Sequence, residues 1–159
     1  MKTAPLTLCI VEDDPTYQHL LLSYMNVLGH TAQGFYSGEE FLKQVHDKPD
    51  VVILDHHLGG ELQGVDVLQI LKREHRDTPV IYVTGEESIT LVSNIFRNGS
   101  QDFIFKDSAS LLRLKLSLDK IAQAKRIDLK TKAKLKIRFM AFIMASVSLV
   151  IFLLYLIII

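Results

Sequence analysis

The chain has 159 residues, of which 48% are hydrophobic and 23% are charged, and its formal net charge is zero. This length gives room for one domain and a short extension. The one cysteine, Cys9, excludes an internal disulfide, and its position in an apolar run indicates a small buried hydrophobic residue.

The balanced total charge conceals three different regions. Residues 1–119 carry 10 Lys and Arg against 17 Asp and Glu, so this part of the chain is acidic. Residues 120–138 carry eight basic residues and one acidic residue, and residues 139–159 carry no charge. Such asymmetry points to a membrane or a nucleic acid as the partner of the basic stretch.

The first predicted element is a buried strand over residues 6–11, an apolar run that ends at a cluster of acidic residues. Pro15 follows, and proline is well suited to the first turn of a helix. Apolar residues at helical spacing then predict a helix over residues 16–28, which Gly29 ends.

A weak strand over residues 31–36 and a helix over residues 37–46 come next. Ser37 is a suitable N-cap for this helix, and Glu40, three residues later, completes the pattern of a capping box. The clearest strand of the chain is the apolar run over residues 51–54.

The second half of the chain continues the alternation of strands and helices. Helices are predicted over residues 65–74 and 88–97, strands over residues 80–83 and 102–105, and a final helix from Ser108 or Ser110. Alternating elements of these lengths predict a doubly wound α/β domain, in which helices cover both faces of a parallel sheet.

Residues able to do chemistry follow the predicted strands: Glu12 and Asp13, then Asp55, then Thr84, then Lys106. The carboxyl ends of parallel strands share one edge of the sheet, so we expect these side chains in one crevice. Clustered carboxylates repel each other unless they bind a cation, and hard oxygen ligands favour Mg²⁺. A carboxylate beside a metal, an ammonium and a hydroxyl is suited to accept a phosphoryl group.

These motifs resemble the receiver domain of response regulators. The matching residues are Val11-Glu12-Asp13-Asp14, Asp55 after Val51-Val52-Ile53-Leu54, Val83-Thr84-Gly85, and Gly99-Ser100-Gln101-Asp102-Phe103 leading to Lys106. The match covers about residues 5–120, with all four motifs in order. The resemblance implies a flavodoxin-like sheet of five parallel strands in the order 2-1-3-4-5.

The resemblance also implies how the site works. Asp55 would accept a phosphoryl group from a histidine kinase or a phosphotransfer protein, without turnover as an enzyme. Glu12 and Asp13 would bind Mg²⁺ together with Asp55, and the backbone carbonyl of His57 would complete the protein ligands.

Other positions would transmit or tune the signal. Thr84 would move to bond the phosphoryl group, Lys106 would neutralise it, and Phe103 would act as the aromatic switch. His57 and Glu86 occupy the positions that tune phosphoryl lifetime in the family. The signal would change the face of the fourth and fifth helices, where a second copy of the chain could bind.

The sequence departs from the family after Lys106, where Asp107 replaces the usual proline and its cis peptide bond. A cis bond before a residue other than proline costs ~3–4 kcal/mol, so we expect a trans peptide here. Asp107 keeps open the alternative of a pseudo-receiver, a protein-binding module that accepts no phosphate. A phosphatase with an Asp nucleophile is a second alternative, although such enzymes commonly carry an Asp where this chain has His57.

Two further groups of residues have competing interpretations. The pair His56-His57, with His46 and His75 elsewhere, raises the alternative of a zinc site, but the spacing favours ordinary loop histidines. The aromatic residues Phe96, Phe103 and Phe105 are expected in the core.

The C-terminal part is predicted to attach the protein to a membrane. Residues 139–159 are uncharged, and 21 helical residues span roughly 30 Å, the thickness of the hydrocarbon layer. The basic stretch before them fits the positive-inside rule and attracts anionic lipid, while DNA binding is not expected. We therefore predict a receiver in residues 1–120 on the cytoplasmic side, a basic juxtamembrane helix in residues 121–138 and a single transmembrane helix in residues 139–159.

Overall fold

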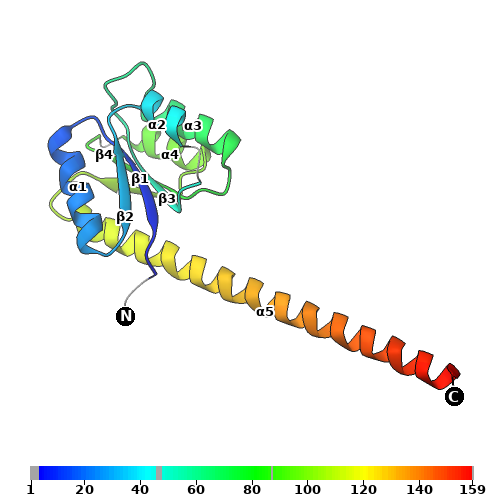
Figure 1. The fold of residues 1–159 in the computed structure, drawn as a ribbon. Helices are drawn as coiled ribbons and strands as arrows, with labels where there is room; N and C mark the ends of the chain where they lie inside the picture. The colour runs from blue at the N-terminus through cyan, green and yellow to red at the C-terminus, as the bar shows by residue number, and fades with distance from the viewer. Residues whose placement is uncertain (1–3, 46–47, 87, 159) are drawn as a thin grey trace. The chain divides into compact units, whose positions relative to one another are not determined.

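The computed structural model describes residues 4–45, 48–86 and 88–158, with side chains described as far as Ser148. Five strands alternate with five helices along this part of the chain (Figure 1). The strands are β1 (Thr7–Val11), β2 (Thr31–Phe35), β3 (Val51–Asp55), β4 (Val80–Thr84) and β5 (Asp102–Phe105). The helices are α1 (Pro15–Val27), α2 (Gly38–Gln44), α3 (Gly64–Glu74), α4 (Ile89–Arg97) and α5 (Ser110–Ile158).

All five strands pair in parallel, in the order β2-β1-β3-β4-β5. This arrangement confirms the predicted doubly wound, flavodoxin-like sheet. The strands β3 and β4 lie in the interior of the sheet, and every one of their residues is buried. The edge strand β2 keeps several residues exposed or half-buried, and it has only one neighbouring strand.

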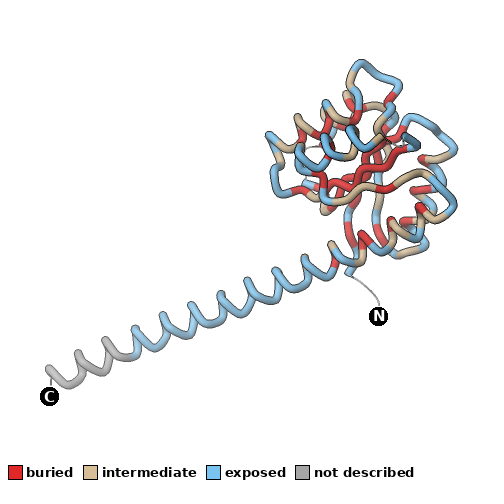
Figure 2. Tube along the Cα trace, turned by 180° about the vertical axis from the view of Figure 1, so that it is seen from behind, coloured by how far each residue is buried: buried red, intermediate tan, exposed pale blue. Residues whose placement is uncertain are grey.

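Helices cover both faces of the sheet, and each face has its own hydrophobic core. One core joins the sheet to α1 and to the first turns of α5, through Leu21, Met25, Leu114 and Leu118. The other core joins the sheet to α2, α3 and α4, through Phe41, Leu68, Leu71 and Ile95. The buried residues therefore concentrate along the sheet and the inner sides of these helices (Figure 2). Burial of each large aliphatic side chain stabilises the fold by about 1.5–3 kcal/mol.

The start of α1 follows the sequence signals closely. Asp14 caps the helix, and its Oδ1 accepts hydrogen bonds from the backbone N–H groups of Thr16 at 2.7 Å and Tyr17 at 3.2 Å. Pro15 occupies the first turn, as predicted. Gly29 follows the helix with a φ of 81°, a conformation that favours glycine.

Cys9 lies in β1 and is buried. Burial raises the pKa of its thiol to about 11. The residue therefore behaves as the small hydrophobic side chain that the sequence predicts.

Two local predictions are wrong. Glu40 does not complete a capping box with Ser37: the Ser37 hydroxyl accepts from the Glu40 N–H at 3.1 Å, but the Glu40 carboxylate accepts from the N–H of Tyr36 instead. Phe96 is 47% exposed, because it lies on the side of α4 that faces away from the core. The end predicted for α2, His46, lies outside the described residues.

Residues up to Ala122 form one compact unit, and residues from Gln123 form a second. The second unit is one continuous helix, and its side chains from residue 125 onward are almost all exposed as far as Ser148 (Figure 2). Asp128 and Lys132, one turn apart, form an ion pair at 2.7 Å. Within the described part of the chain, no helix combines the length and apolarity needed to cross a membrane. The side chains of residues 149–159, half of the predicted transmembrane segment, lie outside that part.

Candidate functional site

The sheet topology brings the predicted site residues to one edge. Asp55 ends β3 and Thr84 ends β4, whereas Glu12 and Lys106 directly follow β1 and β5. The strands are parallel and in register, so these four positions leave the sheet on the same side.

Three carboxylates form what we call the acidic pocket: Glu12, Asp13 and Asp55. One oxygen from each lies within 4.8 Å of the others. Glu12 and Asp55 are buried, while Asp13 is exposed. The pocket therefore combines two carboxylates fixed at strand ends with a third that faces solvent.

Lys106 reaches into this pocket from the end of β5. Its Nζ lies 2.8 Å from Glu12 Oε2 and 2.9 Å from Asp55 Oδ2, and also 4.7 Å from the centre of the Tyr17 ring. Burial by itself lowers the pKa of Lys106, but the hydrogen bonds to Glu12 and Asp55 leave that pKa above its ordinary value. Lys106 is thus a fixed positive charge between two buried carboxylates.

Glu12 has a perturbed pKa. Its burial raises its pKa to about 7, and the hydrogen bond from Lys106 only partly opposes this effect. A carboxylate that is costly to ionise in this environment gains from a divalent cation. Three carboxylates with converging oxygens are also the donor set that Mg²⁺ prefers, so the residues fit this ion.

The backbone around Asp55 is closely packed. Asp55 Oδ1 accepts a hydrogen bond from the N–H of His56 at 2.7 Å. The N–H of Gly64 bonds to the carbonyl of His56 at 2.9 Å, and a Cβ at Gly64 would overlap the carbonyl oxygen of Asp55. Glycine at this position therefore allows the start of α3 to approach the end of β3.

The two predicted switch residues, Thr84 and Phe103, contact residues other than the three carboxylates. Thr84 is buried, and its hydroxyl accepts a hydrogen bond from the N–H of Glu86 at 3.1 Å. The Phe103 ring is nearly parallel to the ring of Tyr82, with centroids 6.5 Å apart, and meets Phe105 edge to face at 4.8 Å. Phe103 thus packs against the core on the side of α3 and α4.

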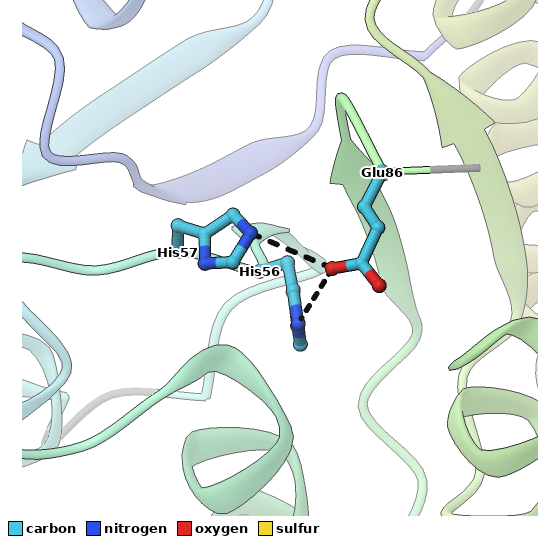
Figure 3. A group of neighbouring side chains, drawn as sticks. All are labelled: His56, His57 and Glu86. Carbon is cyan, nitrogen blue, oxygen red and sulfur yellow. Dashed lines mark ion pairs between the residues drawn. The ribbon is translucent and has the colours of Figure 1, made fainter. Parts of the chain in front are cut away.

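A second cluster, which we call the histidine group, consists of His56, His57 and Glu86 (Figure 3). Glu86 Oε2 lies 3.5 Å from the Nε2 atom of each histidine. Burial, and then the neighbouring His57, lower the pKa of His56, although Glu86 and Asp55 oppose this effect. The sequence singles out His57 and Glu86 as separate tuning positions and does not predict that their side chains meet. The signal that indicates this contact is the adjacency of β3 and β4.

The loop after β5 carries Asp107 directly after Lys106. The described residues contain no cis peptide bond, as expected for Asp107 after Lys106. Asp107 forms an ion pair with Arg113, which lowers the pKa of the Asp107 carboxyl, and it accepts a hydrogen bond from the N–H of Ala109 at 2.8 Å. Arg113 also donates to the carbonyl of Phe105 at 3.2 Å. These contacts fix the loop that carries Lys106.

Together, an acidic pocket at the carboxyl edge of a doubly wound sheet and a lysine bridging two of its acids define a receiver. Residues 8–116 match the family described as the response regulator receiver domain. The chain belongs to this family. Receiver domains generally bind Mg²⁺ at their acidic pocket.

Particular relatives share this domain. The luminescence regulatory protein LuxO of Vibrio campbellii is 35% identical over 98 residues, which make up 61% of this chain and 21% of LuxO. A putative NtrX-like response regulator of Rickettsia typhi is 30% identical over 134 residues, or 80% of this chain and 28% of that protein. The chain thus covers only 21–28% of the length of these curated relatives.

Solved structures show the same fold. NtrX from Brucella abortus superposes with a TM-score of 0.72 at 24% identity, covering 81% of this chain and 29% of NtrX. The signal receiver domain of a putative LuxO repressor protein from Vibrio parahaemolyticus has a TM-score of 0.68 at 25% identity, covering 79% of this chain and 95% of that domain.

Proposed function

We propose that this protein is a phosphoacceptor, in which Asp55 accepts a phosphoryl group from a histidine kinase or a phosphotransfer protein. The observation that carries this proposal is the position of Lys106, whose Nζ lies within 3 Å of both Glu12 and Asp55. The same ammonium that holds these carboxylates is available to pair with the oxygens of a phosphoryl group at Asp55.

In the proposed reaction, a carboxylate oxygen of Asp55 attacks the phosphorus of a phosphohistidine. The oxygen–phosphorus bond forms as the phosphorus–nitrogen bond breaks, and the leaving imidazole takes a proton from solvent. Mg²⁺ held by Glu12, Asp13 and Asp55, with the carbonyl of His57 as a further predicted ligand, would offset the charge of the transferred group. Lys106 orients and neutralises that group, and no turnover of a separate substrate is involved.

The proposed output is a conformational change that begins at Thr84. Its hydroxyl, which accepts a hydrogen bond from the N–H of Glu86, would move to donate one to a phosphoryl oxygen, and the packing of Phe103 against Tyr82 changes in response. The altered face of α4 and α5 would then bind a partner or a second copy of the chain. Glu86, in the loop after β4, and His57, in the loop after β3, would tune the lifetime of the phosphoryl group.

We also propose that the chain is anchored in a membrane by one helix over residues 139–159, with the receiver on the cytoplasmic side. The support comes from the sequence: 21 uncharged residues follow a stretch of eight basic residues and one acidic residue. Extraction of membranes at alkaline pH tests this part of the proposal. The full-length chain should stay in the membrane fraction, and its release into the soluble fraction would contradict the anchor.

Intact-mass measurement of the full chain in mild detergent tests the phosphoacceptor. With Mg²⁺ and a small phosphodonor, the wild type should gain the mass of one phosphoryl group, and Asp55→Asn should gain none. Asp77→Asn, a change at an exposed acid outside the pocket, is the matched control and should behave like the wild type. If the wild type gains no mass, the protein is the alternative, a pseudo-receiver that binds a partner without phosphorylation.

A further inference from the structure

The histidine group joins two loops that are far apart in the sequence. His56 and His57 follow Asp55 at the end of β3, and Glu86 lies two residues after the end of β4. Because β3 and β4 are neighbours, with Asp55 opposite Val83, the loops leave the sheet side by side. The three side chains point toward one another (Figure 3), and their donor atoms lie within 4.8 Å of one another.

The spacing of these atoms differs from that of an ordinary hydrogen-bonded pair. Glu86 Oε2 is 3.5 Å from each histidine Nε2, whereas N–H···O hydrogen bonds are usually about 2.7–3.2 Å long. Ligand atoms around a tetrahedral Zn²⁺, at bond lengths of about 2.0–2.1 Å, are about 3.3–3.4 Å from one another. The two Glu86–histidine separations are therefore close to those between ligands of one zinc ion, and the ligand atoms of all three residues lie within 4.8 Å of one another.

The orientation of His56 agrees with this assignment. Its Nδ1 is hydrogen-bonded to the hydroxyl of Tyr82 at 2.8 Å, and its Nε2 faces Glu86. Tyr82 is fully buried, so it fixes the imidazole from the core. Histidines that bind zinc commonly use the other ring nitrogen for a hydrogen bond of this kind, which sets the tautomer and the orientation of the ring.

The donor types decide which metal fits. Two imidazoles and one carboxylate suit zinc and other transition metals, whereas Mg²⁺ prefers oxygen ligands. His57 and Glu86 are both exposed to solvent, so a fourth position is open to water or to a small anion. The two groups thus offer different donors: only oxygen in the acidic pocket, and two nitrogens with one carboxylate in the histidine group.

We propose that His56, His57 and Glu86 form a Zn²⁺ site that links the β3–α3 and β4–α4 loops beside the acidic pocket. The site uses none of the side chains of Glu12, Asp13 or Asp55. Zinc binding can therefore be tested whether or not Asp55 accepts a phosphoryl group.

The test is a Zn²⁺ titration of the full chain in mild detergent, with excess Mg²⁺ and a chromogenic chelator as competitor. We expect one Zn²⁺ per chain. His57→Ala and Glu86→Gln should each weaken binding by more than about 100-fold, beyond the range for loss of an outer-shell partner. Tyr82→Phe should weaken it by about 10-fold through that outer-shell effect. Both ligand residues are at the surface, so circular dichroism should show a folded protein for their variants.

His19→Ala is the matched control, because His19 is an exposed histidine of α1, and it should bind zinc like the wild type. Co²⁺ should give the absorption bands of a tetrahedral site in the wild type and lose them in His57→Ala. The proposal is overturned if the wild type binds zinc no more tightly than His57→Ala. It is also overturned if Asp13→Asn, rather than Glu86→Gln, abolishes binding, since zinc would then occupy the acidic pocket.

Discussion

The acidic pocket and the histidine group lie at the same edge of the sheet but differ in how they are built. In the acidic pocket, buried carboxylates on strand ends contact Lys106 at 2.8 and 2.9 Å. In the histidine group, Glu86 Oε2 lies 3.5 Å from the Nε2 atoms of the half-buried His56 and the exposed His57. In the acidic pocket, folding therefore holds charged side chains in direct contact. In the histidine group, it leaves donor atoms at a separation that suits an added metal ion. The predictions below test this difference by comparing matched variants, and the comparisons run from the largest expected effect of a substitution to the smallest.

Removal of the lysine from the acidic pocket should have the largest effect. Lys106→Met leaves Glu12 and Asp55 buried without a positive partner, so the free energy of unfolding in metal-free buffer should fall by about 3 kcal/mol. This value is at the lower end for a broken buried pair, because Lys106 is partly exposed. Urea denaturation measures it, and added Mg²⁺ should restore part of the loss.

The corresponding change in the histidine group is His57→Ala. Without added metal it should change the free energy of unfolding by less than about 0.5 kcal/mol, as for other surface positions. Equal effects of Lys106→Met and His57→Ala would show that the two sites do not differ in the way described.

Two glycine-to-alanine substitutions compare how closely the backbone is packed at the two sites. Gly64→Ala places a Cβ against the carbonyl of Asp55 and should lower the free energy of unfolding by about 2 kcal/mol, as expected for overpacking. Gly85→Ala, in the loop that carries Glu86, meets no atom within 4 Å and should leave stability nearly unchanged. Thermal or urea denaturation of both variants checks this, and a tolerated Gly64→Ala would contradict the close approach.

The pH dependence of stability should report the buried carboxylate of Glu12. Its pKa is about 7 in the folded protein and about 4.5 when unfolded, so the folded state holds the extra proton between these values. Stability in metal-free buffer should therefore fall as the pH rises from about 4.5 to about 7. The slope should be at most about 1.4 kcal/mol per pH unit, the value for one proton.

Glu12→Gln is the variant that isolates this effect, because it cannot titrate. Urea denaturation with a chelator at several pH values should give a flatter curve for Glu12→Gln than for the wild type. Parallel curves would show that another group dominates.

The sequence predicts the acidic pocket well because the features that indicate it lie within short stretches of the chain. Each strand is a short apolar run, each acid directly follows such a run, and the alternation with helices requires parallel strands. The meeting of Glu12, Asp55 and Lys106 at one edge follows from these features, whereas the strand order is implied by the resemblance to receiver domains.

Other contacts depend on details that the pattern of residue types does not contain. The meeting of Glu86 with His56 and His57 requires the path of two loops. Arg113 reaches back to Phe105 and Asp107 from the next helix, and Glu40 bonds to Tyr36 rather than to Ser37, because side chains of similar reach have several backbone partners available. Tertiary packing determines which of these backbone groups each side chain binds.

The environment of Cys9 makes this chain convenient for site-specific labelling. At pH 7, a thiol with a pKa of about 11 is ionised in about one molecule in ten thousand, and only the thiolate reacts with maleimides. A cysteine introduced at an exposed position, such as Ile89→Cys at the start of α4, would be ionised to a few per cent and react far faster. Fluorescent or spin probes can thus be attached to this chain without first replacing its native thiol.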